Sequence, residues 1–234
     1  MDKIMYLSQF DLMSSLSETD LVEMDSMTSI TTLPKHTTIQ RPDTFTEGFY
    51  FIKRGKVRLY TLSPEGKQFT VDMLSEGNVF GEMKGISLGT RDLYIETLEN
   101  CDICLMDRNR FEQFLIDHPA FMMRMMHVLS ERMKRMSELT QTLALGNLHD
   151  KIIHSLCRLA EQMGWTKKDE YCLIQCTITH QEIAWMAGAS RESVTVAIKE
   201  LSQSGRIRTG FKSASLHASE LRAFRQLISP LQDG

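Results

Sequence analysis

Two short helical patterns joined by a tight turn occupy residues 179–207. Thr179 with Glu182 three residues later has the spacing of a capping box, and Ser190 can cap the second predicted helix. Gly188 lies between the two patterns, where a sharp turn needs a positive φ. Apolar residues fall on one face of each helix, namely Ile183, Ala184 and Ala187, then Val194, Ile198 and Leu201. The pattern predicts a helix-turn-helix, with a buried helical hairpin as the alternative.

The second predicted helix presents side chains that can read base edges. Arg191 can donate two hydrogen bonds to guanine O6 and N7, and Glu192 can accept one from the cytosine N4 amine. Thr195 and Val196 lie on the same outer side, and the methyl groups of valine favour contact with thymine. We therefore expect this helix to enter the major groove of DNA.

Further polar and basic residues around the motif are candidates for contact with DNA. The stretch after Gly205 predicts a wing strand whose basic side chains follow the phosphates, with a solvated basic edge as the alternative. The wing candidates are Arg206, Arg208 and Lys212, and those in the helices and their caps are Thr179, Gln181, Ser190 and Lys199.

The composition is that of a globular protein with an uneven distribution of charge. The 234 residues carry a net charge of −3, which divides into −5 over residues 1–149 and +2 over residues 150–234. The weak basic excess at the C-terminal end is consistent with phosphate contact but does not establish it. The sequence has no apolar run of the roughly 18 residues that a membrane helix needs, and no signal-peptide layout at residues 1–8. We expect a cytoplasmic protein of two domains with no membrane partner.

Short β-rich runs between residues 32 and 106 alternate with turn signals and predict a small β-barrel. Residues 50–60 are expected to form a hairpin that turns at Arg54 and Gly55. The glycines around residues 77–82 are expected to let the backbone approach a ligand closely.

A long helix is predicted from Pro119 to about residue 145. Its apolar residues recur at alternating steps of four and three, which is typical of a two-stranded coiled coil and predicts a homodimer. The seam consists of Met122, Met126, Leu129, Met133, Met136, Thr140 and Leu143. Phe121, Met125 and Val128 broaden the stripe, so a helix that lies on its own barrel is the alternative.

These features together resemble the cyclic-AMP receptor protein and fumarate-nitrate regulator (CRP/FNR) family. The resemblance covers nearly the whole chain and rests on Gly55-Lys56-Val57, Phe80-Gly81-Glu82 with a later Arg91, the long helix, and Gln181-Glu182-Ile183-Ala184 with Ser190-Arg191-Glu192-Ser193-Val194. It implies an α+β fold with a cyclic-nucleotide-binding-type β-roll (jelly-roll barrel), a long dimerisation helix and a C-terminal winged helix-turn-helix. The corresponding ranges are 1–117 for the effector-sensing domain, 118–146 for the helix and hinge, and 147–234 for the DNA-binding domain.

The resemblance also implies function. It indicates a homodimeric transcription regulator that binds a palindromic operator, responds to a small-molecule effector and works with RNA polymerase. A constitutive DNA-binding protein whose β-roll is only a dimer scaffold is one alternative, and a signalling subunit that binds a nucleotide without touching DNA is another. The sequence lacks the phosphate-loop, nucleophile-elbow and zinc-protease motifs, and its acidic residues are scattered, so we expect no enzyme.

Resemblance to the nucleotide-binding branch implies an effector site on the β-roll. It places Gly81 and Glu82 at the ribose, Arg91 on the cyclic phosphate and Ser137 of the long helix near the base. If no nucleotide binds, Arg91 is expected to pair with Asp92 or Glu96, and Gly81 and Glu82 to form only a barrel turn.

Three departures from that branch argue against cyclic AMP. Asp92 follows Arg91 where the branch has a small hydroxyl residue, and its carboxylate would repel a phosphate. The segment between Glu82 and Arg91 is one residue short, and Met136 stands where a second polar contact to the base is expected. We expect an apolar or cationic effector, or none.

The five cysteines are expected to be buried small hydrophobes. Cys104 falls where the oxygen-sensing branch has an iron–sulfur ligand, but no cysteine precedes Cys101, so we expect no iron–sulfur cluster. Cys172 and Cys176 are expected on one face of a strand, with His180 four residues further on. Core packing is the first interpretation, and a metal or thiol switch in a redox-responsive regulator is the alternative. No histidine has zinc-ligand spacing, and none is identifiable as a haem ligand.

Overall fold

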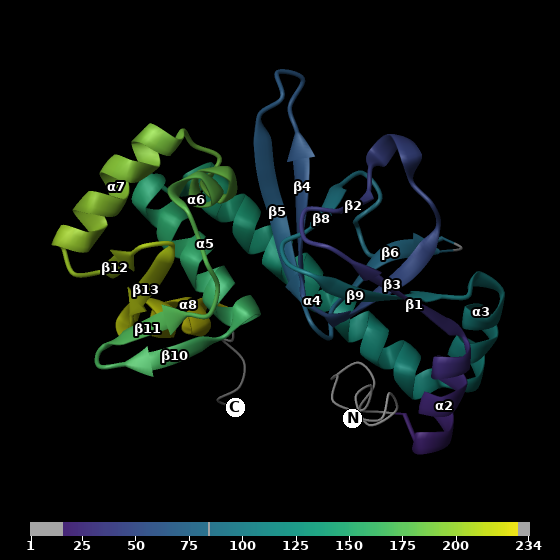
Figure 1. The fold of residues 1–234 in the computed structure, drawn as a ribbon. Coiled ribbons are helices and arrows are strands. Elements are labelled where there is room, and N and C mark those ends of the chain that lie inside the picture. Colours follow the sequence, from purple (N-terminus) through teal and green to yellow (C-terminus); the bar gives the residue numbers. More distant parts are fainter. Residues whose placement is uncertain (1–15, 84, 229–234) are drawn as a thin grey trace. The chain divides into compact units, whose positions relative to one another are not determined.

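The computed structural model describes residues 16–83 and 85–228, which pack as two compact units (Figure 1). The first unit contains the described residues up to 61 together with 72–135, and the second contains 62–71 together with those from 136 onward. The sequence region on which the signal-peptide expectation depended, residues 1–8, lies outside the described residues.

The first unit is built on two antiparallel sheets, with strand orders β1-β9-β3-β6-β7 and β2-β8-β4-β5. The strands are β1 (Thr28–Leu33), β2 (Thr38–Gln40), β3 (Gly48–Arg54), β4 (Lys56–Leu62), β5 (Gln68–Ser75), β6 (Val79–Met83), β7 (Ile86–Ser87), β8 (Tyr94–Thr97) and β9 (Cys101–Met106). The helices α2 (Glu18–Ser26), η2 (Pro42–Thr44) and α3 (Arg108–Asp117) accompany them. This β-roll confirms the predicted barrel, because short strands with close turns pair antiparallel rather than through crossover helices.

The predicted hairpin over residues 50–60 is wrong, because β3 and β4 belong to different sheets. The turn is at Gly55, as expected, with a φ of +99°. A Cβ at this position would lie 2.5 Å from the Cys101 sulfur and 2.7 Å from the Asn100 carbonyl oxygen. Only glycine fits so close to the start of β9, and the turn carries the chain from one sheet to the other.

The long helix α4 (Pro119–Leu145) has one face buried in the first unit and another that is exposed. Phe121 and Met125 belong to the core cluster, and Phe121 packs edge-on against Phe114 of α3 at 5.4 Å between ring centroids. The exposed methionines are Met122, Met123, Met126, Met133 and Met136. The helix therefore packs on its own β-roll and also retains an apolar surface, which is compatible with the predicted dimerisation.

The second unit combines helices with a four-stranded sheet of order β10-β11-β13-β12. Its helices are α5 (Leu148–Met163), α6 (His180–Ala187), α7 (Arg191–Gln203) and α8 (Ala218–Ile228), and its strands are β10 (Trp165–Lys168), β11 (Tyr171–Ile174), β12 (Ile207–Gly210) and β13 (Ser213–His217). Asn147 caps α5 by accepting a hydrogen bond from the Asp150 N–H. The antiparallel strands β12 and β13 follow α6 and α7 as a wing, which confirms the predicted winged helix-turn-helix.

Candidate functional site

The turn between α6 and α7 has the predicted local chemistry. The Thr179 hydroxyl accepts a hydrogen bond from the Glu182 N–H at 3.2 Å, and the Glu182 carboxylate accepts one from the Thr179 N–H at 2.6 Å. Gly188 ends α6 in the left-handed conformation with a φ of +62°. The Ser190 hydroxyl accepts a hydrogen bond from the Ser193 N–H at 3.1 Å, which starts α7. These caps fix the angle between the two helices.

Helix α7 buries its apolar side and exposes the predicted reading side. Val194 and Ile198 are buried, together with Ala197 and Leu201. The predicted DNA-binding residues of this helix are all exposed, namely Arg191, Glu192, Thr195, Val196 and Lys199. Val196 retains 59% of its accessible surface, although burial is favourable for a valine. The exposed face is therefore available to a ligand that offers both polar and apolar contacts.

Thr195, on the exposed face of α7, also forms contacts within the second unit. Its hydroxyl donates to the Arg191 carbonyl oxygen at 2.8 Å and lies 3.0 Å from the His180 Nδ1. This contact joins the start of α6 to the recognition face of α7. His180 was not predicted to belong to this site, because the contact depends on how the two helices cross.

Two of the three predicted wing cations, Arg206 and Arg208, contact side chains within the second unit. Arg206 donates to both carboxylate oxygens of Glu220, at 2.6 and 3.0 Å, and this pairing raises the pKa of the guanidinium. The pairing joins the residue before β12 to α8, so the Arg206 guanidinium already has a carboxylate partner within the second unit. Arg208 lies 3.8 Å above the Tyr171 ring, and the Tyr171 hydroxyl donates to the Gly205 carbonyl oxygen at 2.7 Å. Stacking occupies the flat face of the Arg208 guanidinium and leaves its edge to donate hydrogen bonds.

The predicted effector residues of the β-roll lie together at β6 and the loop before β8. Arg91 pairs with Glu82 at 2.9 Å and lies 5.0 Å from the centre of the Phe45 ring. The partner of Arg91 is therefore Glu82, and the expected pairing with Asp92 or Glu96 is wrong. Asp92 is exposed.

Gly81 supports this loop through its backbone. It has a φ of +116°, and an added Cβ would collide with the Gly48 carbonyl oxygen of β3. Its N–H donates to the Thr90 hydroxyl at 2.9 Å, and its carbonyl oxygen accepts from the Leu88 N–H at 3.1 Å. The close approach that this glycine permits is to the neighbouring strand β3.

A buried arginine of α4, which the sequence did not single out, contacts the same loop. Arg132 donates to the Leu88 carbonyl oxygen at 2.7 Å, and its Nη2 lies 3.9 Å from the Asp72 carboxylate. Both side chains are buried in the first unit. The only sequence signal was an arginine at a helical step from the buried Phe121 and Met125, and solvated arginines are common at such positions.

Met136 and Ser137 remain predicted effector contacts. They lie on the part of α4 that belongs to the second unit, whereas Gly81, Glu82 and Arg91 lie in the first. Met136 and Ser137 are both exposed.

Among the described residues no disulfide joins the five cysteines, and four of the five are buried. Strand β11 ends at Ile174, so Cys176 lies beyond it, and the expected pair of sulfurs on one strand face is wrong. Burial raises the pKa of the Cys101, Cys157 and Cys172 thiols, which disfavours the thiolate that redox chemistry needs. Residues 16–83 and 85–228 contain no group of three His, Cys, Asp or Glu side chains that could hold a metal. The described helices also include none with the length and apolar character to cross a membrane.

Two family profiles match the chain. The cyclic nucleotide-binding domain profile matches residues 30–118, and the Crp-like helix-turn-helix domain profile matches residues 150–224. The chain is 27% identical over 176 residues to the CRP-like cAMP-activated global transcriptional regulator of Mycobacterium tuberculosis, covering 75% of this chain and 78% of that protein. It is 26% identical over 194 residues to the anaerobic regulatory protein of Bacillus subtilis, covering 82% and 81%.

Solved structures share the fold. A CooA mutant from Carboxydothermus hydrogenoformans has a TM-score of 0.74 at 20% identity, covering 98% of this chain and 96% of that one. FixK2 from Bradyrhizobium japonicum has a TM-score of 0.69 at 17% identity, covering 84% and 96%. With a β-roll, a long helix and a capped, winged helix-turn-helix, the chain belongs to the CRP/FNR family of DNA-binding transcription regulators.

Proposed function

We propose that this protein is a homodimer that binds an inverted-repeat DNA operator through α7 and is gated by a signal received at the β-roll. The observation that carries this assignment is the exposed face of α7, on which Arg191, Glu192 and Val196 stand beside one another. The caps at Thr179 and Ser190 orient that face before any ligand is bound. A preoriented reading helix loses little conformational freedom on binding.

Arg191 and Glu192 are assigned to base edges. The guanidinium matches O6 and N7 of guanine, and the carboxylate matches the N4 amine of cytosine, so each half-site should require a G·C pair. Val196 can offer only methyl contacts, which favour thymine. Thr195 is restrained by its hydrogen bond to the Arg191 carbonyl oxygen and contributes mainly shape.

Contacts to phosphate are assigned to polar residues around the reading helix. Arg208 and Lys212 belong to the exposed wing, and Thr179, Gln181, Ser190 and Lys199 belong to the two helices and their caps. Such contacts set affinity and register but carry no base information. Arg206 is left out of this group because Glu220 already occupies its guanidinium.

The dimer is assigned to the exposed methionines of α4. Met126 and Met133 are 58% and 74% exposed, and apolar side chains at such steps usually meet a partner helix. A symmetric dimer of this kind would place the two reading helices about 34–36 Å apart, so the half-sites should lie roughly 10 to 10.5 base pairs apart. Activation of transcription from such an operator would involve contact with RNA polymerase.

The signal is proposed not to be cyclic AMP, although several relatives are named as cAMP-activated. Glu82 already engages Arg91, and Asp92 adds a second carboxylate next to it. A cyclic phosphate would have to compete with Glu82 and tolerate Asp92, which is unfavourable for an anion. An apolar or cationic effector fits this loop better, and constitutive binding is the second candidate.

Selection of bound duplexes from a random pool, with and without cell extract, tests these assignments together. We expect an inverted repeat with a required G·C pair in each half, and a gain in binding when extract supplies the effector. Equal enrichment with and without extract would favour the constitutive alternative. Recovery of no sequence preference from either pool would refute α7 as a reading helix.

A further inference from the structure

We propose that Phe211, at the tip of the wing, inserts its ring into the DNA minor groove next to the major groove that α7 reads. This assignment rests on the proposed function, since it needs α7 to bind DNA. Phe211 is 92% exposed, which is the largest exposed fraction among the exposed large hydrophobic residues of the described chain. A phenylalanine in water gains free energy when it is buried, so a partner that covers it would gain affinity.

The wing presents this ring on a short and well-defined turn. Strands β12 and β13 pair up to Gly210 and Ser213, so Phe211 and Lys212 alone form the connection. Lys212 has a left-handed φ of +52°, which helps the chain to reverse direction within two residues. The tip is therefore narrow, with one aromatic ring and one cation at its end.

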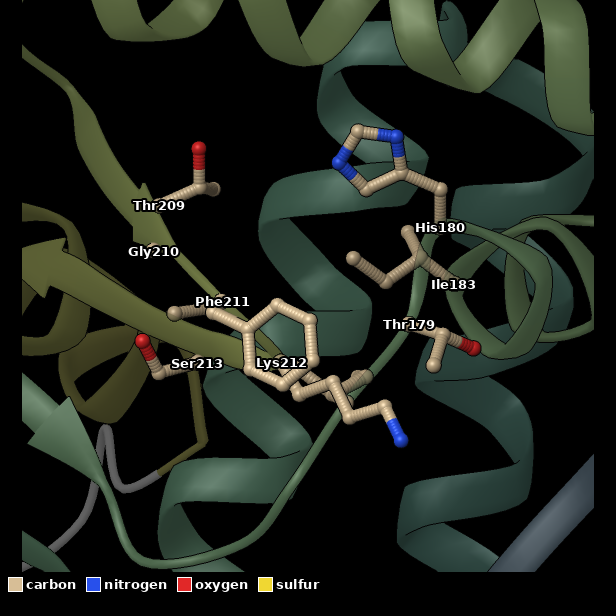
Figure 2. A pocket seen from close by; sticks show the side chains of 10 residues that line it. Thr179, His180, Ile183, Thr209, Gly210, Phe211, Lys212 and Ser213 are labelled. Carbon is tan, nitrogen blue, oxygen red and sulfur yellow. The ribbon is translucent and has the colours of Figure 1, made fainter.

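The tip is also tied to the reading motif. The Ile178 N–H donates to the Lys212 carbonyl oxygen at 3.1 Å, directly before the Thr179 cap of α6. A groove of about 200 Å³ lies between the tip and the start of α6, and Figure 2 shows Phe211 on one side of it with His180 and Ile183 on the other. Because this hydrogen bond connects the tip to α6, the ring should keep a fixed offset from the face of α7.

The charge around the ring favours DNA as the partner. The Lys212 ammonium lies 5.6 Å from the centre of the Phe211 ring, and Arg208 lies on the same hairpin. A cation beside an apolar wedge suits the minor groove, where phosphates line both walls and an inserted ring partly unstacks one base step. The adjoining minor groove lies about half a helical turn, or roughly 5 base pairs, from the bases that α7 contacts. A flexible TA or CA step at that distance should bind best, because it is unstacked most easily.

The test measures binding of the full-length protein to its selected operator by fluorescence anisotropy, from 50 to 200 mM salt. The variants are Phe211→Ala, Phe211→Leu and Lys212→Ala, and the control is Ile116→Ala, which removes a 68% exposed apolar side chain from α3. Phe211→Ala should weaken binding about tenfold with an unchanged salt slope, because the lost contact is apolar. Phe211→Leu should retain part of the affinity, and Lys212→Ala should lower the salt slope by about one ion.

A second selection from a random pool, now with the Phe211→Ala protein, gives the decisive comparison. The preference for a flexible step about 5 base pairs from the required G·C pair should disappear, while the G·C requirement remains. Unchanged affinity and flank preference in Phe211→Ala would overturn the assignment, as would a loss that only lowers the salt slope. A defect confined to transcription with RNA polymerase would assign the ring to a protein partner instead. If the native protein binds no duplex selectively, the proposed function fails rather than the role of Phe211.

Discussion

The guanidinium of Arg132 in α4 lies 3.9 Å from the carboxylate of Asp72 in β5, with both side chains buried. Arg132 also donates to the Leu88 carbonyl oxygen in the loop that leads to Thr90 and Arg91. Two buried charges thus connect the long helix to the candidate effector loop within the first unit. Burial lowers the pKa of Arg132, and the Asp72 carboxylate opposes that effect.

Removing one member of this pair should destabilise the first unit strongly. Asp72→Ala leaves the Arg132 guanidinium buried without its carboxylate, so the free energy of unfolding should fall by about 3 to 5 kcal/mol. The double variant Asp72→Leu with Arg132→Met removes both charges and should recover much of that loss. Urea denaturation of the two single variants and the double variant gives the coupling energy. A double variant as unstable as the sum of the single variants would show that the two groups do not interact.

Acidification should destabilise the second unit through His154. Within the described part of the chain, neither ring nitrogen of His154 has a hydrogen-bond partner, and the ring packs edge-on against Phe224. Burial, and secondarily the charge of Arg158, lowers the pKa of His154 from 6.5 to about 4. The unfolded chain therefore takes up a proton as the pH falls below 6.5, while the folded protein resists until about 4. The stabilising contribution of neutral His154 is complete above pH 6.5 and is lost across that window.

The measurement is the thermal unfolding midpoint between pH 7.5 and 4.5. His154→Leu should flatten the decrease of the midpoint on acidification, because leucine has no proton to gain. His127→Leu, which changes an exposed histidine of α4, is the matched control and should retain the native pH dependence. An equal pH dependence in the native and His154→Leu proteins would contradict this role for burial.

Local signals were sufficient for the helix-turn-helix, whereas the β-roll site depends on contacts distant in sequence. The caps at Thr179 and Ser190 and the left-handed Gly188 all involve residues within a few positions of one another, so their spacing could be predicted. The turn at Gly55 was also placed correctly, but the sheet that β4 joins depends on β8, far along the chain. A local pattern contains no information about that choice.

The ion pairs of the effector loop and of the wing were harder to predict for the same reason. Arg91 could have paired with any nearby carboxylate, and the fold of the loop over β6 selects Glu82. Arg206 has the appearance of a phosphate ligand in the sequence, and only the packing of α8 against β13 reveals Glu220 as its partner. Ion pairs between separate elements are determined by the tertiary fold and not by residue spacing.

Cyclic AMP should bind weakly and without effect on operator affinity. Calorimetry with a panel of nucleotides should give no micromolar dissociation constant for the native protein, because Glu82 and Asp92 oppose an anion at Arg91. Asp92→Ser, which restores the small hydroxyl residue of the nucleotide-binding branch, should raise cyclic AMP affinity. Micromolar binding by the native protein, with a gain in operator affinity, would show that Asp92 has been misinterpreted.

Charge on the exposed face of α4 should dissociate the proposed dimer. Leu129 packs partly against the core of the first unit, so Leu129→Asp would disturb folding as well as association, and the two effects would not be separated. Met133 is 74% exposed, and Met133→Asp should leave the unfolding midpoint nearly unchanged while shifting sedimentation from dimer to monomer. Operator affinity should fall as well, because each monomer would bind a single half-site alone. Met123→Asp changes an exposed methionine outside the predicted seam and serves as the control. A dimer that survives Met133→Asp would place the interface elsewhere.

The reading face of α7 should respond to substitution one base pair at a time. Glu192→Ala should cost about 1 to 3 kcal/mol on the selected operator and relax the requirement for cytosine at one position. Val196→Arg should instead add a base requirement, because a guanidinium in place of the 59% exposed valine can pair with a second guanine. Operator selection with each variant measures both changes, and Arg208→Ala serves as the comparison, since a phosphate contact should weaken all sequences alike. If Arg208→Ala altered the selected sequence while Glu192→Ala left it intact, the wing and not α7 would read the bases.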